Sequence, residues 1–477
     1  MKIAMITSES NPFAKTGGLA DVVYALSREL VKMKEEVYIV LPYYRLIKIK
    51  HPNLKVEFVR KISLRLGWRY QDADVYKLNH EGITFYFIDN EFYFGRESLY
   101  SYGDDDERFA FFTRASVELF KQLNIKLDLI HLHDWQVGML PLLIKHNGEY
   151  VDFYKNTKTV LTIHNPAFQG VLDVFRAQEF YHLTYELLDN YHFKFYDSVS
   201  SLKAGIYAAD KLTTVSPTHA LELQTKEGAK GLEHVILSRK DDFSGILNGI
   251  DYEEFDPSKD PLIAKNYSKT DFKQNKVENH DALLKRFNLP ISDAPIFAIV
   301  TRLTWQKGVD LIIAGARKAL RRGGYFIALG SGEYEVEQML NNLINEFPGQ
   351  VGIYIGYSNE LAHLIYAGAD FFFMPSLFEP CGIGQMIACR YGTLPIVRYT
   401  GGLKDTIIGY DGSNVKKANG FGFFDYDVSE IEKQTDLALD TYENKPLLQK
   451  LQLNAMKSDF TWSRSAQSYL KLYKSIV

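Results

Sequence analysis

Residues 1–41 read MKIAMITSESNPFAKTGGLADVVYALSRELVKMKEEVYIVL, and the order of their patterns decides the fold class. Met1–Ile6 is a short apolar run followed by Ser, Asn, Pro and Gly, which is typical of a buried strand and its loop. Leu19–Met33 has helical spacing, and Val37–Leu41 is a second apolar run. A strand, a loop, a helix and a strand in this order predict a parallel α/β sheet.

The same alternation continues through the first half of the chain. Between Lys55 and Ile88, three stretches rich in Val, Phe and Tyr predict an antiparallel insert, and Arg108–Leu123 returns to helical spacing. Further buried-type strands, each followed by helix-forming sequence, are predicted at Leu127–Leu132, Thr159–Ile163 and Leu212–Val215. The first half is therefore expected to be one α/β domain.

A change of composition between Asp241 and Pro261, to Gly, Asn, Asp, Pro and Ser, predicts a domain boundary. Beyond it the strand-helix rhythm starts again, which predicts a second doubly wound domain. Its strands are expected at Ile296–Val300, Tyr325–Leu329, Gly352–Ile355, Asp370–Met374 and Leu394–Val397, with helices such as Val309–Leu320 and Glu333–Asn345 between them. The tail from Ser429 is helical in pattern throughout. The expected domains are 1–245 and 246–457, with a closing segment over 458–477.

The composition excludes several classes of protein. The chain has 477 residues, 46% of them hydrophobic and 24% charged, which excludes long disorder. With 55 Lys and Arg against 59 Asp and Glu, the net charge of −4 gives no overall positive field for nucleic acid or an anionic membrane. Only two cysteines are present, and neither a signal peptide nor a long apolar run is visible, so a cytoplasmic location is expected.

The loop Lys15–Asp21 (KTGGLAD) lies between the first predicted strand and helix. Ligands bind at the carboxyl ends of strands in open α/β sheets, and two glycines let backbone N–H groups approach an anion there. Neither the dinucleotide pattern G-x-G-x-x-G nor the P-loop pattern is present. The alternative is a plain glycine turn with a solvated Lys15.

Histidines mark two further strand ends, in the segments His131–Trp135 (HLHDW) and Thr162–Pro166 (TIHNP). Strand alternation places His131 and His133 on one face, so these ends present neutral donors and acceptors and one carboxylate. A metal site needs three or four convergent ligands, which this pattern does not supply. Hydrogen-bonded structural histidines and a substrate-contacting pair, His164 and Asp134, both stay open.

Four loops of the second half carry charge, glycine or an aromatic ring at a predicted strand end. In Thr301–Gly308 (TRLTWQKG), Arg302 and Lys307 flank a strand-to-helix turn and can converge on a diphosphate, although a solvated basic loop fits as well. Tyr357 ends another strand, where it can stack on a nucleobase or pack at the rim.

Phe378–Gln385 (FEPCGIGQ) sets a carboxylate beside a glycine-bearing helix start, and Tyr399–Leu403 (YTGGL) repeats the Gly-Gly pattern. Carboxylates accept hydrogen bonds from sugar hydroxyls while amides hold phosphate. Loops of this kind in both halves predict one cleft between two domains.

Taken together, these motifs resemble those of bacterial glycogen synthases and plant starch synthases. The resemblance rests on KTGGLAD at 15–21, HxHDW at 131–135, NGID at 248–251, RLTWQKG at 302–308 and FEPCG at 378–382, in order and over nearly the whole chain. It implies the GT-B fold, in which two Rossmann-like domains with parallel sheets face an interdomain cleft. It also implies retaining transfer of glucose to an α-1,4-glucan, usually from ADP-glucose, and a final helix that returns to the first domain.

The resemblance implies roles residue by residue. The residues expected in catalysis are Glu379, Arg302, Lys307, His164 and Asp134. The residues expected to bind the donor are Lys15, Gly17, Gly18, Asp21, Asn248, Tyr357, Cys381, Gly382, Thr400, Gly401 and Gly402. Two positions depart from the family: Gly384 stands where a phosphate-contacting Thr is frequent, and Ile387 stands where related transferases have a second Glu.

The implied mechanism is a front-face displacement in which the leaving phosphate takes the acceptor proton. No cofactor or metal is expected, since Arg302 and Lys307 replace the cation, and the D-x-D pairs at 72–74 and 425–427 are expected to be solvated surface. The partners are a nucleotide-sugar donor and an α-glucan acceptor.

The rival classes of protein are a nicotinamide oxidoreductase and a non-catalytic glucan-binding protein. The choice of ADP- or UDP-glucose, the product and the oligomeric state stay open.

Overall fold

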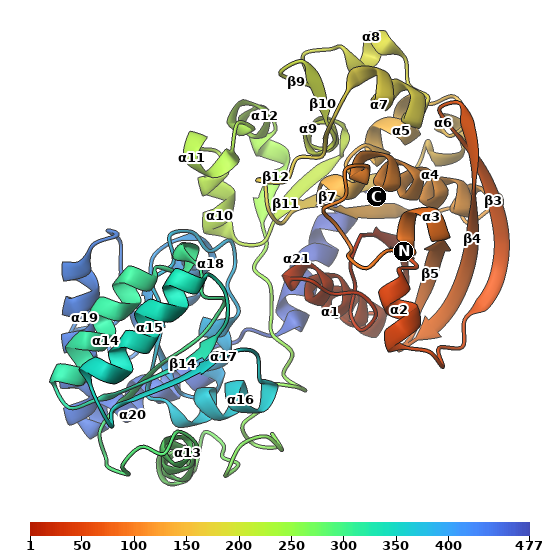
Figure 1. The fold of residues 1–477 in the computed structure, drawn as a ribbon. Helices are drawn as coiled ribbons and strands as arrows, with labels where there is room; N and C mark the ends of the chain where they lie inside the picture. Colours follow the sequence, from red (N-terminus) through yellow and green to blue (C-terminus); the bar gives the residue numbers. More distant parts are fainter. The chain divides into compact units, whose positions relative to one another are not determined.

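A computed structural model describes residues 1–477, and the chain divides into two compact units. Unit 1 comprises Met1–Ile246 and Trp462–Val477, and unit 2 comprises Leu247–Thr461 (Figure 1). The first crossing lies within one residue of the expected boundary at 245/246. Both termini belong to unit 1, because the last helix is part of it.

Unit 1 is built on a nine-stranded sheet with the order β12-β11-β7-β6-β1-β2-β5-β4-β3. A small second sheet, β8-β10-β9, lies outside it. The strands are β1 Lys2–Ile6, β2 Glu36–Pro42, β3 Glu57–Leu66, β4 Arg69–His80, β5 Ile83–Asp89, β6 Leu129–His133, β7 Lys158–Ile163, β8 Val171–Leu172, β9 Lys194–Phe195, β10 Ser198–Ser200, β11 Lys211–Thr214 and β12 Phe243–Gly245.

The helices of unit 1 cover both faces of this sheet, as the buried apolar runs of its strands require. They are α1 Gly18–Lys32, α2 Arg45–Lys50, α3 Glu91–Phe94, α4 Asp105–Gln122, α5 Leu140–His146, α6 Val151–Tyr154, α7 Val174–Tyr181, α8 Tyr185–Leu188, α9 Ser201–Ala208, α10 Pro217–Glu222, α11 Lys226–Ala229, α12 Glu233–Ser238 and α21 Trp462–Lys474.

One strand of the expected antiparallel insert belongs to the parallel sheet. β3 and β4 form the predicted antiparallel hairpin, and β4 runs antiparallel to β5. β5, however, pairs in parallel with β2, so the insert has only two strands and the prediction of three was wrong. Ile83, Phe85, Phe87 and Ile88 are fully buried, which is the pattern of a central strand.

Unit 2 has a six-stranded parallel sheet with the order β15-β14-β13-β16-β17-β18. Its strands are β13 Ile296–Val300, β14 Tyr325–Gly330, β15 Val351–Ile355, β16 Phe371–Met374, β17 Leu394–Arg398 and β18 Phe421–Phe423. Its helices are α13 Phe272–Arg286, α14 Val309–Arg321, α15 Tyr334–Glu346, α16 Asn359–Gly368, α17 Gly384–Arg390, α18 Gly401–Thr406, α19 Val428–Glu443 and α20 Lys445–Lys457. A second Rossmann-like unit was predicted, and the expected strands all occur.

The second crossing between the units comes four residues later than expected. Residues 458–461 belong to unit 2 because backbone and side-chain bonds tie them to residues 250–252. The Ile250 N–H donates to the Phe460 carbonyl at 2.8 Å, and the Tyr252 hydroxyl donates to the Ser458 carbonyl at 3.2 Å. This extended segment also interrupts the tail, which is not helical throughout.

The final helix α21 packs in the core of unit 1. Trp462, Ala466, Tyr469 and Tyr473 are buried in that core, and α21 lies beside α1 (Figure 1). The Tyr473 hydroxyl is 2.7 Å from Nδ1 of His131 on β6. The apolar stripe that the sequence shows at the C-terminus therefore has its partner surface in the first unit.

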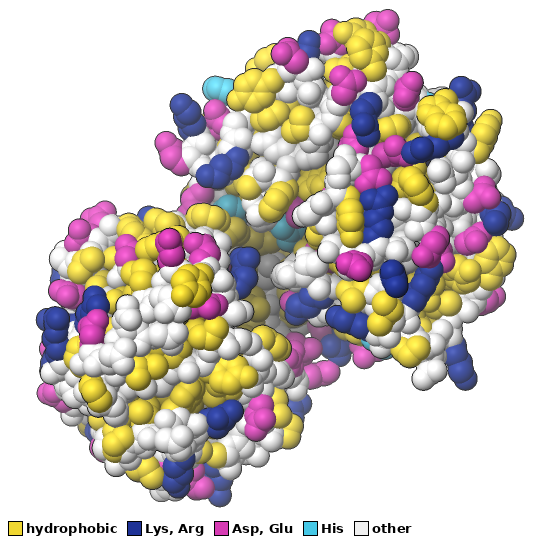
Figure 2. All heavy atoms as spheres, in the orientation of Figure 1, with side chains coloured by type: hydrophobic (Ala, Val, Ile, Leu, Met, Phe, Trp, Pro, Cys, Tyr) yellow, Lys and Arg dark blue, Asp and Glu magenta, His cyan; other side chains and the backbone are white.

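Charged side chains of both signs are interspersed over the visible face of each unit (Figure 2). This distribution agrees with the small net charge of −4. No helix is both long and apolar enough to cross a membrane.

Candidate active site

Three adjacent strands of unit 1 end at residues that the sequence singled out. β1, β6 and β7 are neighbours and run in parallel, so their carboxyl ends meet at one edge of the sheet. Lys15 follows β1, Asp134 follows β6 and His164 follows β7. Parallel strand order therefore gathers these three segments, as the sequence predicted.

The loop before α1 is held by carboxylates of its own chain. The Lys15 ammonium donates to Asp21 Oδ1 at 2.8 Å, and Asp21 also accepts from the Asn11 amide. The Gly17 N–H donates to Glu9 Oε2 at 3.3 Å. Of the two glycine amides expected at an anion, only that of Gly18 is unengaged. A Cβ at Gly17 or Gly18 meets no atom within 4 Å, so this surface is open.

Asp134 occupies a turn in the left-handed region, with φ of 59°. Its carboxylate accepts the N–H of His164 at 2.7 Å and that of Asn165 at 3.4 Å, which joins the ends of β6 and β7. Burial of the carboxylate raises its pKa to about 7, with a smaller contribution from the negative charge of Glu9. Burial thus makes the protonated form of Asp134 far more favourable than that of an exposed carboxyl.

Three histidines form a row behind this turn. His133 Nδ1 is 3.1 Å from His164 Nε2, and the ring centroids of His131 and His133 are 4.3 Å apart. Burial lowers the pKa of His131 and of His164 to about 3, so both rings are neutral at physiological pH. His131 bonds to Thr162 and Tyr473 through its two nitrogens and is structural. Nowhere do three or more His, Cys, Asp or Glu side chains converge on a possible metal position.

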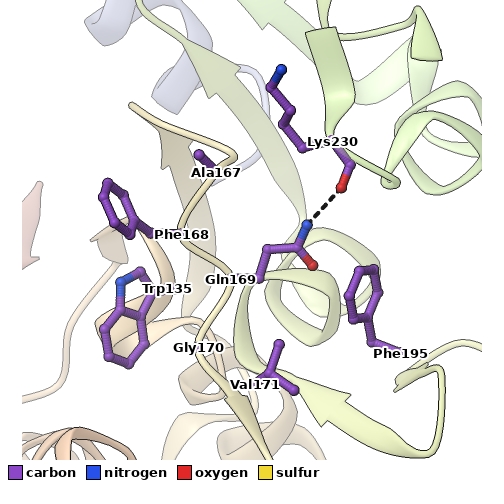
Figure 3. A pocket seen from close by; sticks show the side chains of 8 residues that line it. All are labelled: Trp135, Ala167, Phe168, Gln169, Gly170, Val171, Phe195 and Lys230. Carbon is purple, nitrogen blue, oxygen red and sulfur yellow. Dashed lines mark hydrogen bonds between the residues drawn. The ribbon is translucent and has the colours of Figure 1, made fainter. Parts of the chain in front are cut away.

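The segments that carry Asp134 and His164 continue into a cavity of about 490 Å³. Trp135 and Phe168 line one side of it, and Val171 and Phe195 line the other (Figure 3). Gln169 donates to the Lys230 carbonyl at 2.9 Å across its floor. The aromatic rings and polar groups make this cavity suited to a sugar ring.

In unit 2, Lys307 and Glu379 form a buried ion pair. β13 and β16 are adjacent, and the loops after them bring the Lys307 ammonium to 2.6 Å from Glu379 Oε2. The Ser376 hydroxyl donates to the same oxygen at 3.1 Å. The two side chains expected at the donor diphosphate and at the sugar are thus in direct contact, with Ser376 as a third member.

Arg302 and Tyr357 stand apart from this pair. The Arg302 side chain is exposed and makes no hydrogen bond or ion pair, so its guanidinium is available to an anion. Tyr357 follows β15, the edge strand, and 82% of its surface is exposed. Arg302 and Lys307 share the loop after β13, whereas Tyr357 follows a strand two positions away in the sheet.

Asn248 joins the Cys381–Gly382 loop. The backbone N–H of Asn248 partly offsets the rise in pKa that burial gives the Cys381 thiol, and the side-chain Oδ1 of Asn248 is buried without a hydrogen-bond partner. Gly382 has φ of +69°, and a Cβ there would lie 2.6 Å from Gln385 Oε1. An unpaired buried amide oxygen is costly unless a ligand hydroxyl or water completes it, so Asn248 Oδ1 has the capacity to accept one more hydrogen bond.

Gly401 and Gly402 pack tightly against the loop that carries Glu379. A Cβ at Gly401 would lie 2.0 Å from the Glu379 carbonyl oxygen, and one at Gly402 would lie 2.0 Å from that of Cys381. The Gly402 N–H donates to the carbonyls of Glu379 and Pro380. In this structure the Gly402 amide is therefore already engaged, and the assignment of both glycines to donor binding stays a prediction. The glycines let the segment after Thr400 pack against the Glu379 loop.

Several neighbours of these residues were missed in the sequence. Ser376 and Arg398 hold the Glu379 loop, since Arg398 donates to the carbonyls of Ser376 and Leu377. Glu9 and Tyr100 hold the Lys15 loop. Among these, only Glu9 could have been noticed in the sequence, because it is a carboxylate just after a buried strand.

The D-x-D pairs lie in β4 and before α19. Asp72 and Asp74 pair with Lys61, and Asp427 caps α19.

Family models match both halves of the chain. One described as "Starch synthase catalytic domain" matches residues 2–238, and one described as "Glycosyl transferases group 1" matches residues 282–457. Each match falls within one sheet-bearing unit. Two Rossmann-like units with polar loops at the strand ends define a GT-B glycosyltransferase.

Relatives of known name match over the full length. A glycogen synthase of Clostridium perfringens is 44% identical over 100% of this chain and 98% of its own. One of Geobacillus thermodenitrificans is 41% identical over 100% of this chain and 98% of its own. The chain belongs to the glycogen synthase family.

Solved structures agree with this family. The catalytic domain of starch synthase IV from Arabidopsis thaliana, bound to ADP and acarbose, has a TM-score of 0.89 and 32% identity, covering 99% of this chain and 98% of that one. A sucrose-phosphate synthase from Thermosynechococcus elongatus has a TM-score of 0.58 and 19% identity, covering 99% of this chain and 98% of that one, and shares the fold.

Proposed function

We propose that this enzyme lengthens an α-1,4-glucan by transferring glucose from ADP-glucose to its non-reducing end with retention of configuration. The observation that carries the proposal is the Lys307–Glu379 pair with Ser376 at the ends of adjacent strands, in a chain of this family. It supplies a cation for a leaving diphosphate beside a carboxylate for sugar hydroxyls. The ADP bound in the starch synthase IV structure supports adenine as the base.

The proposed reaction exchanges one C1–O bond for another on the same face of the glucose. The bond from C1 to the diphosphate oxygen breaks, the acceptor hydroxyl oxygen bonds to C1, and the hydroxyl proton passes to the departing phosphate. No protein base is then required, and Arg302 and Lys307 stabilise the negative charge that develops on the diphosphate. Glu379 and Asn248 are proposed to orient the sugar ring.

In unit 1, we assign polar contacts with the substrate to Lys15, Asp134 and His164. Because His164 is neutral, its ring can exchange hydrogen bonds with a hydroxyl without adding a charge. Asp21 pairs with Lys15 and sets the direction of its side chain. Gly18 provides the remaining backbone donor at the start of α1.

A transfer assay tests the reaction. Purified protein is incubated with a maltooligosaccharide and radiolabelled ADP-glucose or UDP-glucose. We expect label in α-1,4-linked product from ADP-glucose at a clearly higher rate than from UDP-glucose. A protein that only binds glucan would give no labelled product. A nicotinamide oxidoreductase would give no labelled product either, but would change the absorbance of an added nicotinamide cofactor. Equal or faster transfer from UDP-glucose would reject the donor assignment.

Activity is expected to be independent of metal ions. Arg302 and Lys307 supply the positive charge at the leaving group, and no cluster of ligands sufficient for a metal occurs. Prolonged EDTA treatment followed by gel filtration should leave the rate of transfer unchanged. If the rate falls and one divalent ion restores it, the proposal of a metal-independent mechanism is wrong.

The aromatic cavity of unit 1 is proposed to hold the acceptor. Phe168 is 64% exposed on its rim, so Phe168→Ala should raise the KM for the glucan by a factor of about 3–10, as the loss of one aromatic contact predicts. The KM for ADP-glucose should not change. Phe175→Ala is the matched control, since Phe175 is also 64% exposed but lies outside the cavity. Equal effects of the two variants would reject this acceptor position.

We also propose that the protein works in the cytoplasm. Its two cysteines, Cys381 and Cys389, are free and buried, and they form no disulfide. Structural disulfides are common in exported proteins and rare in the reducing cytosol, so free thiols favour the cytosol.

A further inference from the structure

Glu9 is a buried carboxylate with no cationic partner. It follows β1, is 4% exposed, and forms no ion pair. Its Oε2 accepts the backbone N–H groups of Thr16 and Gly17, the latter at 3.3 Å. Its Oε1 accepts the Thr16 hydroxyl at 2.6 Å and the Tyr100 hydroxyl at 2.7 Å. The four hydrogen-bond donors to this carboxylate therefore belong to Thr16, Gly17 and Tyr100, and none of them is a cation.

This arrangement holds the residues that lead into helix α1. Gly17 is the N-cap residue of α1, and no side chain caps the helix locally. The Glu9 carboxylate instead accepts the N–H of this N-cap residue and of Thr16 before it, so it holds the residues that lead into the helix. A negative charge at the start of a 15-residue helix is also favoured by the helix dipole.

The Glu9 carboxylate holds a segment that has little packing around it and whose other side-chain contact is the ion pair between Lys15 and Asp21. Lys15, Thr16, Gly17 and Gly18 are all exposed, and neither glycine has an atom close to a possible Cβ. Packing therefore does not determine the backbone of this loop. The bonds to Glu9 do, and they are anchored in turn by Tyr100, whose hydroxyl also lies 2.7 Å from the Ser8 hydroxyl.

We propose that Glu9 is a positioning residue of the transfer reaction, which sets the backbone of the Lys15–Gly18 loop so that the Lys15 ammonium and the Gly18 amide meet the substrate. This inference rests on the proposed function, in which Lys15 and Gly18 contact the substrate. Glu9 itself touches neither the donor nor the acceptor, since its oxygens are occupied by the loop.

The experiment compares three variants of the full chain. Glu9→Ala removes every acceptor, and we expect kcat/KM for ADP-glucose to fall about 100-fold, the scale of a small misplacement of a binding group. Glu9→Gln should keep most of the activity, because its amide oxygen accepts the two N–H groups while its NH2 donates to the two hydroxyls. Asp210→Ala is the matched control. Asp210 likewise accepts a backbone N–H and a hydroxyl, both of Thr159, but at the amino edge of the sheet.

Amide hydrogen exchange gives a readout that does not depend on catalysis. In Glu9→Ala the amides of Thr16 and Gly17 should exchange about tenfold faster or more, while those in the middle of α1 stay protected. If Glu9→Ala does not fold, Thr16→Val serves instead, since it removes only the hydroxyl bond to Oε1 and should lower kcat/KM in the same direction.

Two results would overturn the inference. One is a Glu9→Ala enzyme with kcat/KM within twofold of the wild type and unchanged exchange. The other is an equal loss of activity in Glu9→Ala and Asp210→Ala that follows their melting temperatures. If the wild type itself transfers no glucose, the proposed function fails, and the exchange measurement still decides whether Glu9 orders the loop.

Discussion

Arg302→Ala and Lys307→Ala are each expected to lower kcat about 10²–10³-fold, the usual cost of removing one preorganised group from a developing charge. Both groups are proposed to stabilise the diphosphate as it leaves. Steady-state rates with saturating ADP-glucose and glucan measure the effect. Arg322→Ala and Lys318→Ala are the controls, because these two cations of unit 2 pair with Asp436 and should leave kcat unchanged.

The two variants differ in their effect on stability. Arg302 is exposed and unpaired, so its removal should leave the melting temperature unchanged. Lys307 and Glu379 have side chains only 13% and 10% exposed, and removing Lys307 leaves a buried carboxylate without its partner, at a cost of about 3 kcal/mol. Arg302→Ala is thus the cleaner test. Near-normal turnover in both purified variants would contradict the assignment.

Ending the chain at Thr461, which deletes α21, is expected to prevent unit 1 from folding stably. Tyr469 and Tyr473 are fully buried, and truncating one large buried aromatic side chain costs about 3–5 kcal/mol. Losing both is comparable to the entire stability of a typical domain, about 5–15 kcal/mol. Soluble yield and thermal unfolding by circular dichroism measure the loss. A truncated protein with the wild-type melting temperature and turnover would refute this prediction.

A milder variant separates packing from hydrogen bonding in the same helix. Tyr473→Phe keeps the ring and removes only the hydroxyl that meets His131 Nδ1 at 2.7 Å. The expected loss of stability is about 1 kcal/mol. A loss as large as that of the truncation would place the main contribution of α21 in this one bond.

The strands and helices were largely predictable because their patterns are local. The apolar run Ile296–Val300 coincides with β13, and the helical spacing after Gly308 gives α14. β5 was wrongly predicted to belong to the antiparallel insert. Its sequence, Ile83–Asp89, alternates little between apolar and polar residues, so it does not show which strands lie beside it. Its parallel pairing with β2 depends on how the chain folds back after the β3–β4 hairpin.

The site was predictable as far as loop position and charge decide it. Parallel strand order brings Lys15, Asp134 and His164 to one edge of unit 1, and places Arg302, Glu379 and Thr400 after adjacent strands of unit 2. The sequence did not show that Lys307 pairs with Glu379, that Asp21 pairs with Lys15, or that the Gly402 amide is already used. The Lys307–Glu379 and Gly402 contacts join groups far apart in the sequence, and the Lys15–Asp21 pair depends on the conformation of the loop between them.

The sequence by itself determined that this protein is a two-domain α/β chain with polar loops at its strand ends, because strand and helix periodicity and glycine placement are read from neighbouring residues. The tertiary structure alone decided how those loops are held. Tyr473 reaches His131 across 342 positions of the sequence, the Tyr100 hydroxyl reaches Glu9 across 91, and Lys307 reaches Glu379 across 72. These contacts arise from packing between distant segments, whose free energy no local pattern records.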